Sequence, residues 1–453
     1  MASPYGTTPR SRKANDPMNN IGASYAYVPS SNERLSAVRS KTRAMSVEEL
    51  ALISLSARLL FENGQSTEKV VSTIDQLAGA LGFRATVFPH WDHLTIAMND
   101  GSGSRQEVVA AAPVSVDMSK VAATMGVIDG VCNGRLDALA ARSRLEAVSR
   151  FPAVSITRFA LLGAAGAAAL GVIFGASHLF SLLLIAISAA AGSCLRRWLA
   201  GISRNLFVQP LCAALLAGAI AVRLQLSSAL RLVAGCPCMI LVPGPHVLNG
   251  TIDLARARTG LGASRVAYAG SIILVICAGL LTGLSFGSVS LPVSVPSHPV
   301  PLGYDVIAAG IAVTAYGTFF SMPWRMLPIP TAIGMLAHAA RWGMISAGAG
   351  VEIGALVACL MVGIVITPIA ARLRLPFAAF GFASVVSLIP GVYLFRMAGG
   401  FVDLVTLGDK ATTVVLLNTI SDGTTATLTI LAMAFGLIVP KMCIERFCPR
   451  VAN

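Results

Sequence analysis

Charged residues are scarce in this chain. Asp, Glu, Lys and Arg make up 12% of its 453 residues, whereas apolar residues make up 55% and the mean hydropathy is +0.73. Soluble domains carry about 25% charged residues, so the composition excludes a soluble globular protein and predicts an integral membrane protein in a lipid bilayer. The formal net charge is +13, but the basic residues do not interleave with aromatic residues on a polar domain. We therefore expect no nucleic-acid partner.

A disulfide or metal framework is also missing. There are nine cysteines, and all but Cys132 lie in or beside apolar segments, which is typical of reduced thiols packed as small hydrophobes. The close pair Cys236 and Cys238 lacks the spacing of the usual zinc or thioredoxin motif. We expect no metal and no other cofactor.

Residues 1–45 lack any apolar run that could form the core of a signal peptide. They are rich in Ser, Asn, Pro and Arg, with seven basic and two acidic residues. We interpret this segment as a disordered basic tail in the cytosol. Its alternative roles are solvated filler and a weak attraction to anionic lipid.

Residues 46–150 have the pattern of a small cytosolic α+β domain. Two amphipathic helices are followed by strands at Ala85–Phe88 and Leu94–Met98, which form a hairpin. Helical segments near Val116–Val131 and Arg135–Ser149 then lead to the membrane.

The turn of this hairpin contains His90, Asp92 and His93, to which Glu62 could add a fourth metal ligand. Three ligands on one tight turn point in divergent directions, so ordinary exposed histidines are the preferred interpretation. A rival function of a different class is a membrane-anchored hydrolase with its active site in residues 46–150. No Ser, His and acid set with a recognisable spacing supports that rival.

Ten apolar stretches beyond Phe151 are long enough to cross a bilayer, for which about 17 to 25 residues are needed. Five fall in residues 151–290 and five in residues 291–453, which we predict to be two membrane repeats. The stretches lie near Phe159–Ala176, Leu179–Leu195, Leu206–Val222, Ser227–Gly244, Val266–Phe286, Leu302–Ser321, Pro328–Ile345, Val351–Ala371, Pro376–Met397 and Ile420–Val439.

The short loops give the orientation of these spans. If residues 46–150 are cytosolic, the loops on their side of the membrane hold most of the loop Lys and Arg residues, which predicts that both termini are cytoplasmic. An odd number of spans in each half then inverts the second half relative to the first. The expected fold is thus a polytopic α-helical membrane protein with ten transmembrane helices in two inverted five-helix repeats, in a bacterial inner membrane.

Two of the apolar stretches are interrupted by a Pro-Gly pair, Pro243-Gly244 and Pro390-Gly391. Proline removes a backbone donor, and a membrane helix broken there leaves polar backbone groups free to meet a ligand. Because the break recurs in both halves, we predict that these four residues line the substrate path of a duplicated transporter. Helix packing is the alternative for each of them taken alone.

Polar residues follow both breaks. Asn249 is a candidate partner for a substrate hydroxyl or amide group, and Asp253 and Asp403 lie nine and twelve residues past their glycines. We add these three residues to the predicted path, with proton or ammonium handling assigned to the two carboxylates. An ion pair with a loop arginine, or a helix cap, is the alternative. His338 and Asp422 are weaker candidates for a proton relay; contact with a neighbouring helix and capping are their alternatives.

Three motifs in this chain are shared with a known family. They are Asn63-Gly64, Thr67, Val70, Ile74 and Leu81-Gly82; Leu241-Val242-Pro243-Gly244 with Asn249 and Asp253-Leu254; and Leu388-Ile389-Pro390-Gly391 with Tyr393. From about Ala57 to its end, the chain resembles the threonine/serine exporter family. The resemblance implies a cytosolic N-terminal domain, ten helices in two repeats, and export of threonine and serine by the proton motive force rather than enzymatic activity. A passive channel or a sensor is the other alternative, and the oligomeric state stays open, with a homo-oligomer among the choices.

Overall fold

The computed structural model describes residues 45–99, 103–176, 178–203, 205–223, 232–287, 300–373 and 377–447. Residues Met1–Arg43 form one unit and Ala44–Asn453 another, and all of these residues belong to the second. The predicted tail, apart from Met45, therefore lies outside the described residues. Ser227, where the fourth expected span starts, also lies outside the described residues. The same holds for most of the proline-rich stretch 292–301 between the fifth and sixth expected spans.

The N-terminal portion, residues 45–150, combines four helices with one sheet. The sheet is antiparallel with the strand order β1-β2-β3. The elements are α2 (Val47–Glu62), α3 (Thr67–Ala80), β1 (Arg84–Pro89), β2 (His93–Asn99), β3 (Ser104–Ala110), α4 (Met118–Cys132) and α5 (Ala138–Ser149). The expected hairpin is β1-β2, but the sequence patterns missed β3. This edge strand is mostly polar and exposed, so it lacks the apolar alternation that marks a buried strand.

The described residues after Ser149 are mostly helical. The helices are α6 (Ile156–Ile173), α7 (Leu179–Ile202), α8 (Val208–Arg223), α9 (Leu232–Met239), α10 (Gly244–Ala255), α11 (Thr259–Ser285), α12 (Leu302–Phe319), α13 (Pro328–Ser346), α14 (Val351–Arg372), α15 (Phe377–Val385), α16 (Gly391–Leu407) and α17 (Thr413–Phe447), with 3-10 turns η2 (Trp324–Met326), η3 (Val386–Leu388) and η4 (Gly408–Lys410). Within the described ranges, seven helical segments are long and apolar enough to cross a membrane: α6, α7, α11, α12, α14, α16 with η4, and α17. The protein is therefore a polytopic membrane protein.

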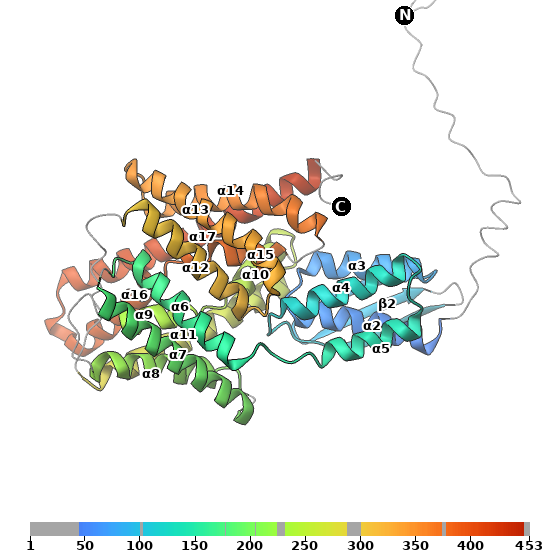
Figure 1. Ribbon diagram of the computed structural model, residues 1–453, viewed down its shortest axis with the longest axis horizontal. Coiled ribbons are helices and arrows are strands. Elements are labelled where there is room, and N and C mark those ends of the chain that lie inside the picture. Colours follow the sequence, from blue (N-terminus) through green and yellow to red (C-terminus); the bar gives the residue numbers. More distant parts are fainter. Residues whose placement is uncertain are drawn as a thin grey trace, which may run out of the picture. The chain divides into compact units, whose positions relative to one another are not determined.

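The two halves of this helical part repeat the same packing (Figure 1). In the first half α6 packs on α7, α7 on α8, α8 on α11 and α10 on α11, and in the second half the pairs are α12 with α13, α13 with α14, α14 with α17 and α16 with α17. The short helices α9 and α15 each pack on the three helices that precede them in their own half. The halves meet along α6 and α12.

Close helix contacts recur at matching places in both halves. Gly283 of α11 meets Gly218 of α8, where an added Cβ would lie 2.9 Å from the Gly218 Cα. Gly363 of α14 meets Gly436 of α17 with the same 2.9 Å clearance to a backbone oxygen. Lipid tails are as apolar as the side chains, so the hydrophobic effect does not drive helix association within a membrane. Small residues let the two backbones approach closely, and van der Waals packing then stabilises the helix pair.

Candidate functional site

Both Pro-Gly pairs form the same tight turn. Pro243 (φ −83°, ψ 59°) and Pro390 (φ −78°, ψ 46°) have dihedral angles close to those of the central residue of an inverse γ-turn. The glycine amide closes each turn by donating to the carbonyl two residues before it, over 2.9 Å at Gly244 and 2.8 Å at Gly391. Each proline is the N-cap of the helix that follows, α10 or α16. Both predicted breaks are thus present, with matching backbone geometry.

Each turn lies against the helix that precedes the other turn. Gly244 contacts the ring of Phe382 on α15, and a Cβ at this position would overlap that ring. Gly391 contacts Met239, the last residue of α9, whose Cγ would lie 2.8 Å from an added Cβ. Since protein interiors are close-packed, neither turn can change shape without moving part of the opposite half.

Tyr316 on α12 provides another link between the halves. Its hydroxyl donates to the backbone carbonyl of Met239 over 2.7 Å, and the side chain is buried. The Met239 carbonyl at the end of α9 thereby gains a hydrogen-bond donor that its own helix does not supply. Sequence reasoning missed Tyr316, because a tyrosine within an apolar span carries no local pattern that marks it as functional.

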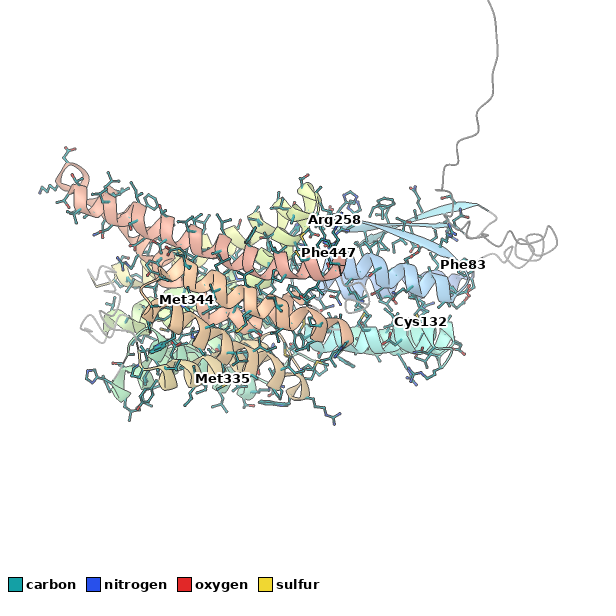
Figure 2. The ribbon with its side chains drawn as sticks, turned by 90° about the horizontal axis from the view of Figure 1, so that it is seen from above. Phe83, Cys132, Arg258, Met335, Met344 and Phe447 are labelled. Atoms are coloured by element: carbon teal, nitrogen blue, oxygen red, sulfur yellow. The ribbon has the colours of Figure 1, made fainter. Side chains whose placement is uncertain are left out.

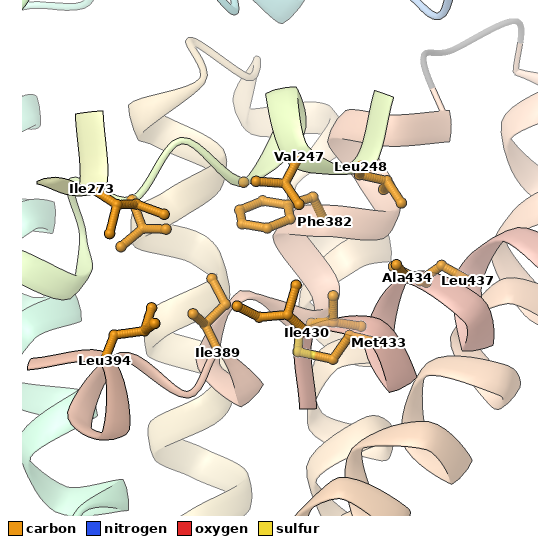
Figure 3. A pocket seen from close by; sticks show the side chains of 13 residues that line it. Val247, Leu248, Ile273, Phe382, Ile389, Leu394, Ile430, Met433, Ala434 and Leu437 are labelled. Carbon is orange, nitrogen blue, oxygen red and sulfur yellow. The ribbon is translucent and has the colours of Figure 1, made fainter. Parts of the chain in front are cut away.

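An apolar pocket of about 60 Å³ lies between the two turns (Figure 3). Val242 and Gly244 of the first turn and Ile389 of the second contribute to its lining, together with Phe382 and Leu394. All of its lining residues are apolar, so it offers no partner to a charged amino acid.

A larger cavity, of about 350 Å³, lies beside the first turn. Pro243 and His246 line it from the break, Arg196 from the end of α7, and Gln209 from α8. Residues 114–116 of the N-terminal portion form part of its wall. Of the predicted path residues, Pro243 therefore reaches a cavity that contains polar and charged side chains, whereas Gly244 lines the apolar pocket.

Asp253 and Asn249 on α10 face the N-terminal portion. The Thr67 hydroxyl donates to Asp253 Oδ2 over 2.9 Å, and Asn249 Nδ2 donates to the Gly64 carbonyl over 3.3 Å. Arg265 of α11 lies 3.4 Å from Asp253, and both side chains are at most 2% exposed. These two predicted path residues make docking contacts, and the structure does not bring them to the apolar pocket.

A network of four ion pairs extends this contact. Arg256, just after α10, binds Glu68 of α3 (2.5 Å) and Glu445 of α17 (2.6 Å). Lys441 of α17 lies 3.4 Å from Glu68 and also binds Glu445. Figure 2 labels the neighbouring Arg258 and the end of α17 at Phe447. Ion pairs thus hold both α17 and the residue that follows α10 to Glu68, at the N-terminal end of α3.

The acidic candidates of the second half have other surroundings. Asp403 is half-buried on α16, and its carboxylate has no ion pair among the residues that the structure describes. Asp422 of α17 binds Arg396 of α16 over 3.0 Å. It lies within α17, which begins at Thr413, so the alternative that Asp422 caps this helix is wrong.

His338 is the centre of a buried hydrogen-bonded chain. Its Nδ1 lies 2.9 Å from Asp305 Oδ2 on α12, and its Nε2 lies 2.7 Å from Ser387 Oγ in η3. All three residues are at most 3% exposed. Sequence reasoning named His338 but missed both partners. Asp305 could have been found from the sequence, because an acidic residue within an apolar span, here the sixth, usually has a functional role.

Comparison with family models identifies the chain. A putative threonine/serine exporter family matches residues 51–287, and a second threonine/serine exporter family matches residues 305–443. The chain belongs to the threonine/serine exporter family. Members of this family are described as exporters and not as enzymes. No solved structure matches the chain.

The first two shared motifs, far apart in sequence, meet in space. Asn63 ends α2 and donates to the Leu59 carbonyl over 2.8 Å. Gly64 follows with φ +92°, a conformation that glycine adopts without steric cost. This turn presents the Gly64 carbonyl to Asn249 and allows α3 to begin at Thr67, which binds Asp253.

The hairpin tip between β1 and β2 is a contact region. Within the described residues no cluster of three metal-ligating side chains is found. Asp92 accepts a hydrogen bond from His93 (2.7 Å), which lowers the pKa of its carboxyl group, and the His90 ring stacks on His93. Trp91 packs against Tyr268 of α11, with ring centroids 5.3 Å apart. The tip thus contacts the helical part through its tryptophan.

Proposed function

We propose that this protein is a secondary active exporter of threonine and serine, driven by the proton motive force, in which two five-helix halves rock against each other. The observation that carries the proposal is the crossed contact of the two breaks, Gly244 on Phe382 and Gly391 on Met239. Two rigid halves that interlock at their broken helices are the arrangement that alternating access requires.

The repeated helix pairs support ten spans in two repeats. With α9–α10 and α15–α16 each counted as one broken span, each half has five spans, and the four long packing pairs of the first half, α6 with α7, α7 with α8, α8 with α11 and α10 with α11, each have a counterpart in the second. Five spans per half make the repeats inverted. The loop charges then favour a cytoplasmic N-terminal portion and cytoplasmic termini in a bacterial inner membrane.

The larger cavity supports solute access from the side of the N-terminal portion. Its wall includes residues 114–116 of that portion, and it ends at Pro243 of the first turn. Val242 lines both this cavity and the apolar pocket between the turns. The geometry therefore fits a state that is open on one side and closed at the crossed turns, as a transport cycle needs.

The chain Asp305–His338–Ser387 is the proposed proton site. Neutral imidazole donates from one nitrogen only, whereas protonated histidine donates from both. Protonation of His338 therefore changes its bond to Ser387, which lies three residues before Pro390. The charged groups that act on His338 are Asp305 and Arg341. A proton taken up here would bias the second turn toward one conformation.

Transport by purified protein in liposomes tests this function. Labelled threonine and serine should cross the membrane faster than in empty liposomes when a pH gradient is applied, and an uncoupler should abolish the accumulation. Flux that ignores the uncoupler would favour the passive channel. No flux above empty liposomes for either amino acid would refute the exporter, and hydrolytic activity of the same preparation would favour the anchored hydrolase.

A further inference from the structure

Three arginines gather near one end of α6 and α7, and two of them have hydrogen-bond partners. Arg158 donates to the Thr318 hydroxyl (3.2 Å) and to the Met322 carbonyl (3.0 Å), with its guanidinium 3.9 Å from the Trp324 ring centroid. Arg197 donates to the Val154 carbonyl. These two cations have structural roles.

Arg158 keeps these two bonds although its own Nε atom is buried without a partner, whereas Arg196 has no hydrogen bond among the described residues. Its Nε and Nη1 atoms are buried, and neither has a hydrogen-bond partner in the described part of the chain. Its guanidinium lies 4.7 Å from the Phe319 ring centroid and 5.9 Å from that of Phe159, so aromatic faces support the cation. A buried, unpartnered N–H costs free energy, and two such groups on one guanidinium indicate a missing acceptor.

The cavity that Arg196 lines has the character of an anion site. Its lining includes Arg197, Gln209 and His246, and no acidic side chain among the lining residues that the structure describes. The His246 Nδ1 atom is also buried without a partner. A positively charged cavity without carboxylates favours an anionic group and disfavours a cationic one.

The size of the cavity selects a small ligand. Its volume of about 350 Å³ is near the lower end of the range for ligand pockets, about 300–1,000 Å³. The fork of a guanidinium matches a carboxylate in a bidentate pair. Tyr268 and Gln209 add a hydroxyl and an amide to the lining, which suits a small polar side chain.

We infer that Arg196 binds the α-carboxylate of the transported amino acid in this cavity, before the solute reaches the first turn. The inference rests on the proposed function. It assigns carboxylate recognition to a side chain at the end of α7, outside the two breaks. It also predicts that cationic amino acids are poor substrates.

The test measures threonine exchange in liposomes for the wild type, Arg196→Gln, Arg196→Lys and the control Arg372→Gln, which replaces an exposed arginine at the end of α14, outside the cavity lining. Charge-assisted hydrogen bonds of this type correspond to about 10- to 100-fold in affinity. We expect the half-saturation concentration of threonine to rise by about that factor in Arg196→Gln, to rise less in Arg196→Lys, and to change less than about threefold in Arg372→Gln.

Threonine amide, which lacks the carboxylate, separates recognition from folding. Wild-type exchange should be inhibited by threonine and hardly by threonine amide, and Arg196→Gln should lose this preference. A merely structural role of Arg196 would lower activity and leave the preference unchanged. Unchanged half-saturation and unchanged preference in Arg196→Gln would overturn the inference.

Thermal stabilisation of the purified protein keeps the two proposals distinguishable. If the wild type does not transport threonine, the exporter fails, and the carboxylate site is then judged by stabilisation with threonine and with threonine amide. Stabilisation by threonine alone, lost in Arg196→Gln, supports the site. Equal stabilisation by inorganic phosphate or by anionic lipid would show a general anion site and would refute amino-acid recognition.

Discussion

The two halves of the helical part carry the same Pro-Gly turn but surround it with different polar groups. In the first half, Asp253 and Arg265 are buried against the N-terminal portion through Thr67. In the second half, Asp305, His338 and Ser387 form a chain within the helices themselves. The comparison teaches that a common scaffold holds two different polar sites: contacts with the N-terminal portion beside the proposed solute cavity in one half, and the proposed proton site in the other.

Replacement of His338 should have the largest effect. His338→Gln keeps a hydrogen-bonding side chain but cannot take up a proton, so threonine accumulation driven by a pH gradient should be lost. Threonine exchange without a gradient should persist, because it needs no net proton movement. Both are measured in the same liposomes, with Ser387→Ala as a variant that keeps the titrating group. Gradient-driven accumulation at the wild-type level in His338→Gln would place coupling elsewhere.

The buried ion pair of the first half, Asp253 with Arg265, should contribute more to the free energy of unfolding than the pair of the second half, Asp422 with Arg396. Asp253→Ala leaves Arg265 buried without its partner, which costs about 3–5 kcal/mol. Asp422→Ala removes one partner of Arg396, whose side chain is 23% exposed, and should cost about 2 kcal/mol, because the guanidinium still reaches water. Thermal unfolding of the purified variants checks the order, and similar losses for both would remove this distinction between the halves.

The two glycines of the turns should also differ. Gly244→Ala places a methyl group into the Phe382 ring, whereas Gly391→Ala meets the flexible side chain of Met239. Overpacking costs about 1–3 kcal/mol, with Gly244→Ala at the upper end. Gly270→Ala, where no atom lies within 4 Å of the added Cβ, is the matched control.

Partial recovery in Gly244→Ala combined with Phe382→Ala would support the crossed contact. No recovery of folding or transport in that double variant would mean that Gly244 is needed for another reason.

The smallest expected effect concerns the hydroxyl that joins the N-terminal portion to α10. Thr67→Val removes the hydrogen bond to Asp253, which should cost about 1.5 kcal/mol because the acceptor is charged. Thr67→Ser should retain it. Limited proteolysis of the N-terminal portion, compared between the two variants, measures the loosening. Equal protection in both would show that the ion pairs of Arg256 suffice for docking.

Much of the architecture followed from local patterns. Long apolar runs marked the helices, because a bilayer requires each span to be apolar and to satisfy its own backbone. The Pro-Gly pairs marked the breaks, because proline removes a donor wherever it stands. The polar edge strand β3 was missed, since edge exposure erases the alternation on which strand prediction depends.

The sequence by itself determined the membrane class, the duplicated pattern and the position of both breaks, since each depends on residues adjacent in the chain. Only the tertiary structure decided which residues from different elements contact each other. Examples are Asp253 with Thr67, His338 with Asp305, and Gly244 with Phe382. Local periodicity gives the face of a helix but not the identity of the helix packed against it. Partner choice depends on close packing between segments up to 373 residues apart.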